Sequence, residues 1–127
     1  MNRLVMPSSI APPAANYAHA VLSEAPGRML HTSGVVPIAP DGSTPESVDE
    51  QAEAVWRNIA AILDDAGMAA SDIVSVTTYV VAGEELAAVM AARDRALAGH
   101  VAASTLVTVP ALARPEWRMV VSVVALT

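Results

Sequence analysis

Residues 114–126 read Arg-Pro-Glu-Trp-Arg-Met-Val-Val-Ser-Val-Val-Ala-Leu, a Pro-Glu-Trp turn followed by an apolar strand. Within residues 119–126 both sets of alternating positions are mainly apolar, so both faces of the expected strand need cover. Residues 72–81, Asp-Ile-Val-Ser-Val-Thr-Thr-Tyr-Val-Val, are rich in β-branched side chains and show a similar two-sided pattern. Two such strands predict a sheet that is buried on both faces.

Further strands are predicted over residues 3–6, 17–23, 28–32 and 104–109, with residues 35–38 extended. Turns are predicted at Ala25-Pro26-Gly27 and Pro40-Asp41-Gly42. The first helix is expected to have Thr44 as its N-cap and Pro45 at its first position, and to end before Gly67. Its apolar face is formed by Val48, Ala52, Val55, Ile59, Ile62 and Ala66. A second helix is predicted over residues 83–98, with Leu86, Val89, Met90 and Leu97 as its apolar stripe.

This order of elements predicts an α+β fold, with a single mixed β-sheet of about six strands and two helices on one face. We expect residues 1–127 to form a single domain. The helices can cover only one face of the sheet, so the second face is expected to pack against another copy of the chain. The alternative is a closed barrel in which these strands lie near the middle.

Composition excludes several classes of protein. The chain is 54% hydrophobic and 3% aromatic, with no Phe and no Cys, which excludes disulfides and cysteine chemistry. Its net charge is −6 and all seven basic residues are Arg, which excludes a Schiff-base lysine and argues against a nucleic-acid partner. The sequence shows no secretory signal pattern and no apolar stretch of membrane-spanning length. We therefore expect a soluble cytoplasmic protein with no membrane partner.

Five segments of the chain, taken in order, resemble the Rid (YjgF, reactive intermediate deaminase) family of small proteins. They are Ala-Asn-Tyr-Ala-His-Ala-Val at 15–21, Ser-Gly-Val-Val-Pro at 33–37, a first helix with Gln51 and Asn58, the strand at 72–80, and the Pro-Glu-Trp turn at 115–117. The resemblance extends over nearly the whole chain. It implies the chorismate-mutase-like Rid fold and a homotrimer with three pockets between subunits.

The resemblance also implies a chemistry, the hydrolysis of enamines and imines such as 2-aminoacrylate to keto acids and ammonia. In the family an Arg pairs with the substrate carboxylate, and a Glu in the last strand positions the attacking water. A Ser-Gly turn and an Asn on the second helix supply orienting hydrogen bonds. No cofactor is implied.

The chain departs from most of these positions. Ala103 stands at the Arg position, Val120 and Ser122 at the two Glu positions, Met90 at the Asn position and Val35 at the Gln position. Tyr17, Ser33 and Gly34 match the family pattern. We therefore interpret the chain as a divergent Rid member that lacks the carboxylate-binding Arg and differs from a standard 2-aminoacrylate deaminase.

The expected site combines residues that match the family with residues that have changed. Tyr17 and Ser33 are the catalytic candidates. The substrate-binding candidates are Gly34, Val35, Met90, Arg93, Ala103, Trp117, Arg118 and Val120. Arg93 and Arg118 are included because either could bind an anion in place of the missing Arg; the alternative is that both are ordinary surface cations. His19, His31 and His100 are scattered, and we expect no metal site.

Three classes of function remain open. The first is a hydrolase-like enzyme that acts on a small, rather apolar imine, enamine or conjugated carbonyl by hydrolysis, deamination or tautomerisation. The second is a small-molecule-binding or regulatory trimer without chemistry of its own. The third, an endoribonuclease, is the least favoured because the chain is acidic and has no Lys.

Overall fold

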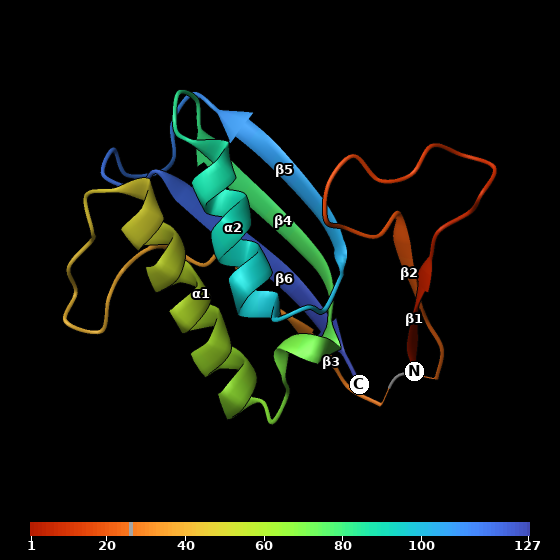
Figure 1. Ribbon diagram of the computed structural model, residues 1–127. Coiled ribbons are helices and arrows are strands. Elements are labelled where there is room, and N and C mark those ends of the chain that lie inside the picture. The colour runs from red at the N-terminus through yellow and green to blue at the C-terminus, as the bar shows by residue number, and fades with distance from the viewer. Residues whose placement is uncertain (26) are drawn as a thin grey trace.

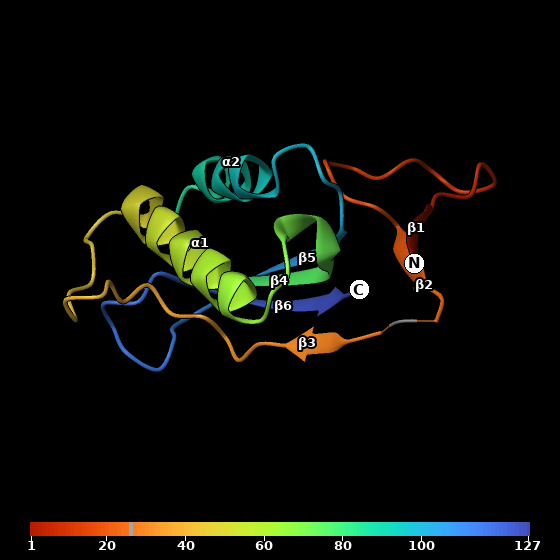
Figure 2. The same cartoon turned by 90° about the horizontal axis from the view of Figure 1, so that it is seen from below.

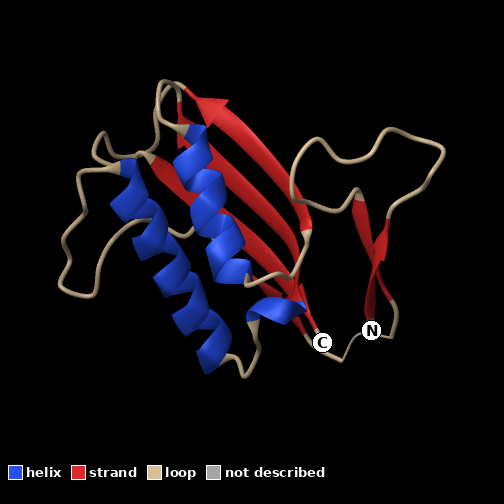
Figure 3. Ribbon diagram, in the orientation of Figure 1, coloured by secondary structure: helices blue, strands red, loops and turns tan. Residues whose placement is uncertain are grey.

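The computed structural model describes residues 1–25 and 27–127 of the chain (Figures 1 and 3). Its helices are α1 (Val48–Asp65) and α2 (Leu86–Leu97), and a short 3-10 turn, η1 (Ala70–Asp72), follows α1. Its strands are β1 (Asn2–Val5), β2 (Ala20–Ser23), β3 (Met29–His31), β4 (Ile73–Val81), β5 (Ala103–Val109) and β6 (Met119–Leu126).

The main sheet has four strands in the order β3-β6-β4-β5, and α1 and α2 lie side by side on one of its faces (Figures 1 and 2). β4 and β5 are parallel because α2 forms the crossover between them, while β6 is antiparallel to both of its neighbours. Tyr79 lies opposite Val107 on one side and Val120 on the other. A mixed α+β fold with two helices on one face is therefore confirmed.

The expectation of one six-stranded sheet is wrong. β1 and β2 form a separate two-stranded sheet, which Figure 1 shows beside the main sheet. It is connected to the main sheet through an isolated bridge between Ala18 and Ala103, and through Nδ2 of Asn2, which donates to the Leu126 carbonyl at 2.9 Å. Because residue 18 already pairs with β5, the strand predicted from residue 17 begins only at Ala20. The predicted turn at 25–27 includes Pro26, which lies outside the described residues.

The N-terminus of α1 also differs from the prediction. Ser47, not Thr44, is the N-cap, and its Oγ accepts a hydrogen bond from the Glu50 backbone N–H at 3.2 Å. Pro45 lies before the helix, where its carbonyl accepts a hydrogen bond from the Gln51 side chain. At the other end the prediction is confirmed, since Gly67 follows the C-cap with a φ of +69°. α2 begins at Leu86, three residues later than expected, after a turn in which Gly83 has a φ of +97°.

The core lies between the two helices and the sheet. Met119, Val121, Val123 and Ala125 of β6 face the helices and are at most 2% exposed. On the opposite face, Val120, Ser122 and Val124 are only half-buried. This second face, which we call the open face, therefore lacks the cover that the two-sided strands predict. In the part of the chain that the structure describes, neither helix combines the length and apolar character needed to cross a membrane.

Candidate functional site

Gly34 lies at the open face, directly beside Val120. A β-carbon at Gly34 would lie 3.5 Å from Cγ1 of Val120, which is an ordinary van der Waals contact. The segment is fixed there because the Val35 N–H donates to the Val121 carbonyl at 2.6 Å, and the Val121 N–H donates back at 3.2 Å. The structure therefore brings together two of the predicted site residues, Gly34 and Val120, from segments far apart in sequence.

Val35 itself does not share the open face with Gly34 and Val120. Its side chain is 8% exposed and packs in the hydrophobic core on the helix side. Successive residues of an extended segment point to opposite faces, so Gly34 and Val35 are necessarily separated. Val35 is thus separated from Val120 but lines a depression together with Ser33 and Gly34, and its predicted role in substrate binding stays a prediction.

A depression of about 470 Å³ lies between this segment and α1. Ser33, Gly34, His31 and Asn58 are among the residues that line it. Nδ2 of Asn58 donates to the carbonyl oxygens of Val36 and Ile38, at 3.1 and 2.9 Å. Asn58 thus fixes the chain just after the Ser-Gly turn, a positioning role that the sequence did not reveal.

Tyr17 and Ala103 are neighbours through the bridge between Ala18 and Ala103. The Ala18 N–H donates to the Ala102 carbonyl at 2.9 Å, which holds the Tyr17 segment against the start of β5. The Tyr17 hydroxyl accepts a hydrogen bond from the Ala14 N–H at 3.2 Å, and its own proton remains available to a ligand. Ala103 pairs with Ser75 of β4.

Arg93 is placed on the helix side of the sheet and is 6% exposed. Its guanidinium contacts the Asp94 carboxylate at 3.1 Å and donates to Ser104 Oγ at 3.2 Å. Met90, one helical turn earlier on α2, is half-buried. Within one chain the sheet therefore separates Arg93 from Val120, and the predicted replacement of the missing Arg by Arg93 stays a prediction.

Trp117 and Arg118 lie in the turn that leads into β6. Nε of Arg118 donates to the Glu84 carboxylate at 2.7 Å, so this guanidinium already has an anionic partner. Trp117 has its indole N–H buried without a hydrogen-bond partner, and the Arg114 guanidinium lies 5.0 Å from the centre of its ring. The turn is held to α1 by Gln51, whose Oε1 accepts from the Arg118 backbone N–H.

Within one chain the ten candidate residues therefore form separate groups. Gly34 and Val120 share the open face, Ser33 lines the depression beside α1, Tyr17 and Ala103 meet at the start of β5, and the two arginines are engaged elsewhere. Among residues 1–25 and 27–127, no group of three His, Cys, Asp or Glu side chains could hold a metal ion. The candidate residues on the sheet carry hydroxyl groups and apolar side chains. They can therefore orient a ligand through hydrogen bonds.

Comparisons with known proteins agree with this fold. A family model described as Endoribonuclease L-PSP matches residues 8–127. A RutC family protein of Haemophilus influenzae is 37% identical over 70 residues, which are 54% of this chain and 54% of that protein. The 2-iminobutanoate/2-iminopropanoate deaminase of Escherichia coli is 40% identical over 55 residues, 42% of this chain and 43% of that protein. The chain thus spans about half the length of the curated relatives it matches.

Solved structures extend the similarity to the full chain. The crystal structure of YyfB from Yersinia pestis, described as a conserved Rid family protein, has a TM-score of 0.89 and 30% identity, covering 99% of this chain and 98% of that one. E. coli TdcF with bound serine has a TM-score of 0.73 at 24% identity, covering 96% and 93%, and shows the shared fold. Because the family model matches nearly all of it, the chain belongs to the Rid (YjgF) family, whose model carries the description Endoribonuclease L-PSP.

Proposed function

We propose that this protein acts on a small, weakly charged imine, enamine or conjugated carbonyl compound, by hydrolysis, deamination or tautomerisation. The site contains Ser33 together with Gly34 and Val120 of the open face and is completed by another copy of the chain. The imine class is suggested by relatives named as imino-acid deaminases. The single observation that carries the proposal is that Gly34 lies against Val120, an apolar residue at the position of the family's water-positioning Glu.

The preference for a weakly charged substrate follows from the arginines. Ala103 and Val120 are neutral, Arg93 lies across the sheet with Asp94 and Ser104, and Arg118 is paired with Glu84. A carboxylate placed beside Val120 would have to give up its hydration without a guanidinium partner. Neutral or weakly polar ligands avoid this cost, so they are the substrates that the site favours.

Two hydroxyl groups supply the polar contacts of the proposed site. The Ser33 hydroxyl is carried by the exposed turn beside Val120, and the Tyr17 hydroxyl has a proton free to donate. Both can orient an imine nitrogen or a carbonyl oxygen for attack by water. We propose that the assembly is a homotrimer. The packing of its subunits then sets the distance between the Ser33 hydroxyl and the Tyr17 hydroxyl across a subunit boundary.

The open face supports this assembly. Tyr79 is 37% exposed and Val107 is 39% exposed, and they lie next to each other and to Val120 across three strands. An apolar patch that continues across a sheet is a common feature of subunit interfaces. A neighbouring subunit packed on this patch would convert the exposed Ser-Gly turn into one wall of an enclosed pocket.

The proposal is tested with a coupled assay that generates 2-aminoacrylate in situ, run beside a panel of neutral imines. We expect turnover of 2-aminoacrylate near background and measurable turnover of neutral imines. Ala103→Phe should abolish the latter by filling the site, while sedimentation shows an unchanged assembly. Turnover of 2-aminoacrylate comparable to that of a family deaminase would contradict the proposed loss of carboxylate binding.

A second candidate function is ligand binding without turnover. The observation that favours it is the replacement of the water-positioning Glu by Val120, which leaves Ser33 and Tyr17 as the polar groups of the site. Saturable binding of a neutral imine analogue, blocked by Ala103→Phe and accompanied by no product, would identify this class. RNA cleavage is the third class, and the net charge of −6 opposes it.

A further inference from the structure

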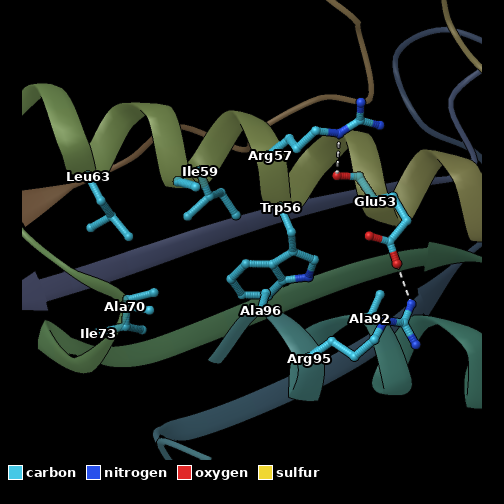
Figure 4. Close-up of a pocket in the computed structure, with 11 residues that line it drawn as sticks. Glu53, Trp56, Arg57, Ile59, Leu63, Ala70, Ile73, Ala92, Arg95 and Ala96 are labelled. Carbon is cyan, nitrogen blue, oxygen red and sulfur yellow. Dashed lines mark hydrogen bonds and ion pairs between the residues drawn. The ribbon is translucent and has the colours of Figure 1, made fainter. Parts of the chain in front are cut away.

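A cleft of about 310 Å³ lies between α1 and α2, on the helix side of the sheet (Figure 4). It is lined by Glu53, Trp56, Arg57, Ile59, Ala60, Leu63, Ala70, Ile73, Ala92, Arg95 and Ala96. This volume falls within the range of small-molecule pockets. The sheet separates the cleft from Val120 on the open face, so it is distinct from the proposed site and independent of it.

The cleft exists because the residues that face each other across it are small. Ala60 on α1, Ala70 on η1, and Ala92 and Ala96 on α2 contribute only methyl groups to its walls. Ala92 and Ala96 are four residues apart and therefore lie on the same face of their helix. Large aromatic side chains that could fill the space are scarce, since the chain has no Phe.

The floor of the cleft is apolar and well buried. Trp56 is 6% exposed, Leu63 is 4% exposed, and Ile59 and Ile73 are each 1% exposed. Figure 4 shows the Trp56 ring between the two helices, with Leu63, Ala70 and Ile73 toward one end of the cleft. Since these side chains are already fixed by the core, the cleft has rigid walls before any ligand arrives.

The other end of the cleft carries the charged residues of its lining, Glu53, Arg57 and Arg95. Glu53 of α1 and Arg95 of α2 form an ion pair there, and their side chains are 50% and 63% exposed (Figure 4). An exposed ion pair of this kind contributes little to stability, so its two partners can be rearranged at small cost. Arg57 extends away from α2 in Figure 4, and its Nε is 3.5 Å from the Glu53 carbonyl oxygen.

We propose that this cleft binds a free α-amino acid with an apolar side chain. The α-carboxylate pairs with Arg95, the α-ammonium pairs with Glu53, and the side chain lies along Trp56 between the alanines. One surface ion pair is thereby replaced by two, within a mouth whose charges are complementary to a zwitterion. A simple carboxylate can pair only with Arg95, and a simple amine can pair only with Glu53. In each case the unpaired residue competes with the ligand for its former ion-pair partner.

The test uses the two tryptophans as reporters in the ¹⁵N-labelled protein. L-phenylalanine is titrated to millimolar concentration while the indole N–H signals of Trp56 and Trp117 are followed by NMR. We expect a saturable shift of the Trp56 signal and a constant Trp117 signal, and the same for L-leucine. The matched probes 3-phenylpropionate and phenethylamine, which each lack one charge, should bind about tenfold more weakly, a loss of about 1.4 kcal/mol.

Variants separate this proposal from a simple packing void. Glu53→Gln and Arg95→Gln should each weaken L-phenylalanine binding about tenfold, and both residues are exposed enough for the fold to survive. Glu50→Gln, an exposed change on the same helix outside the cleft, should leave affinity unchanged. Ala96→Leu should abolish binding by filling the cleft. The proposal is overturned if Trp56 does not respond, if both indoles respond together, or if the two charge variants bind like the native protein.

Discussion

Oε1 of Gln51 accepts a hydrogen bond from the backbone N–H of Arg118 at 2.7 Å, linking α1 to the turn before β6. The Nε2 of the same amide donates to the carbonyl oxygens of Pro45 and Glu116, both at 2.8 Å. Gln51 is completely buried, so these bonds are shielded from water. One side chain thereby holds the segment before α1 and the Pro-Glu-Trp turn in place.

Gln51→Leu is expected to lower the free energy of unfolding by about 3 kcal/mol, because three backbone groups lose the partner that the buried amide supplies. The measurement is urea denaturation at a fixed protein concentration. Glu50→Gln, exposed on the same helix, is the matched control and should change stability very little. Equal effects of the two substitutions would show that the buried amide network has no special role.

Arg93→Met tests whether the buried guanidinium is structural. The substitution keeps a long apolar side chain but removes the contacts to Asp94 and Ser104. We expect a loss of about 2 kcal/mol in stability, since Ser104 and Asp94 lose a charged partner. Affinity for ligands on the open face should not change, because the sheet lies between. A large loss of ligand affinity with unchanged stability would instead make Arg93 a binding residue.

Asp41 is expected to titrate below its usual range. Its Oδ1 accepts hydrogen bonds from Oγ and the backbone N–H of Ser43, at 2.6 and 3.0 Å, and these bonds lower the pKa of the carboxyl from its ordinary value of 3.8. A lowered pKa in the folded state means that the ionised form stabilises the turn above pH 3.8, and that this contribution is lost as the pH falls further. NMR titration of Asp41 checks the direction, with Ser43→Ala as the variant that should move the pKa part of the way back, because the backbone N–H at residue 43 still donates.

The parts of the fold that could be predicted from the sequence are those fixed by strong local patterns. The strands at 73–81 and 119–126 follow from runs of β-branched and apolar residues, and α1 ends just before Gly67, which takes the C′ position. The N-cap was misplaced because Thr44 and Ser47 are both good caps, and Ser47 is selected by the burial of Gln51 against Pro45. No local pattern distinguishes the two.

The separate β1–β2 sheet could not be predicted for a similar reason. Four-residue strands carry little register information of their own. Their position depends on contacts distant in sequence, such as the bond from Asn2 to Leu126 and the bridge from Ala18 to Ala103. Such contacts are visible only in the folded chain.

In the candidate site, too, some features could be predicted from the sequence and others could not. The family resemblance identified Gly34 and Val120, which are neighbours in the structure, but it did not indicate where Arg93 and Arg118 lie. The burial of Arg93 had a signal, because it lies four residues after Val89 and four before Leu97, both buried on α2. The cleft between the helices had a weaker signal in the paired alanines at 92 and 96, which could equally have indicated close helix packing.

The last prediction concerns assembly. We expect sedimentation equilibrium at micromolar concentration to give about 39 kDa, three times the 13.1 kDa of one chain. Val107→Asp should shift the mass toward 13.1 kDa, because it places a charge in the exposed patch beside Tyr79. Ala91→Asp, on the exposed surface of α2, is the matched control and should leave the trimer intact. A native protein that sediments as a monomer would refute both the assembly and a site completed by a neighbouring subunit, because the open face would then be a solvent-exposed surface.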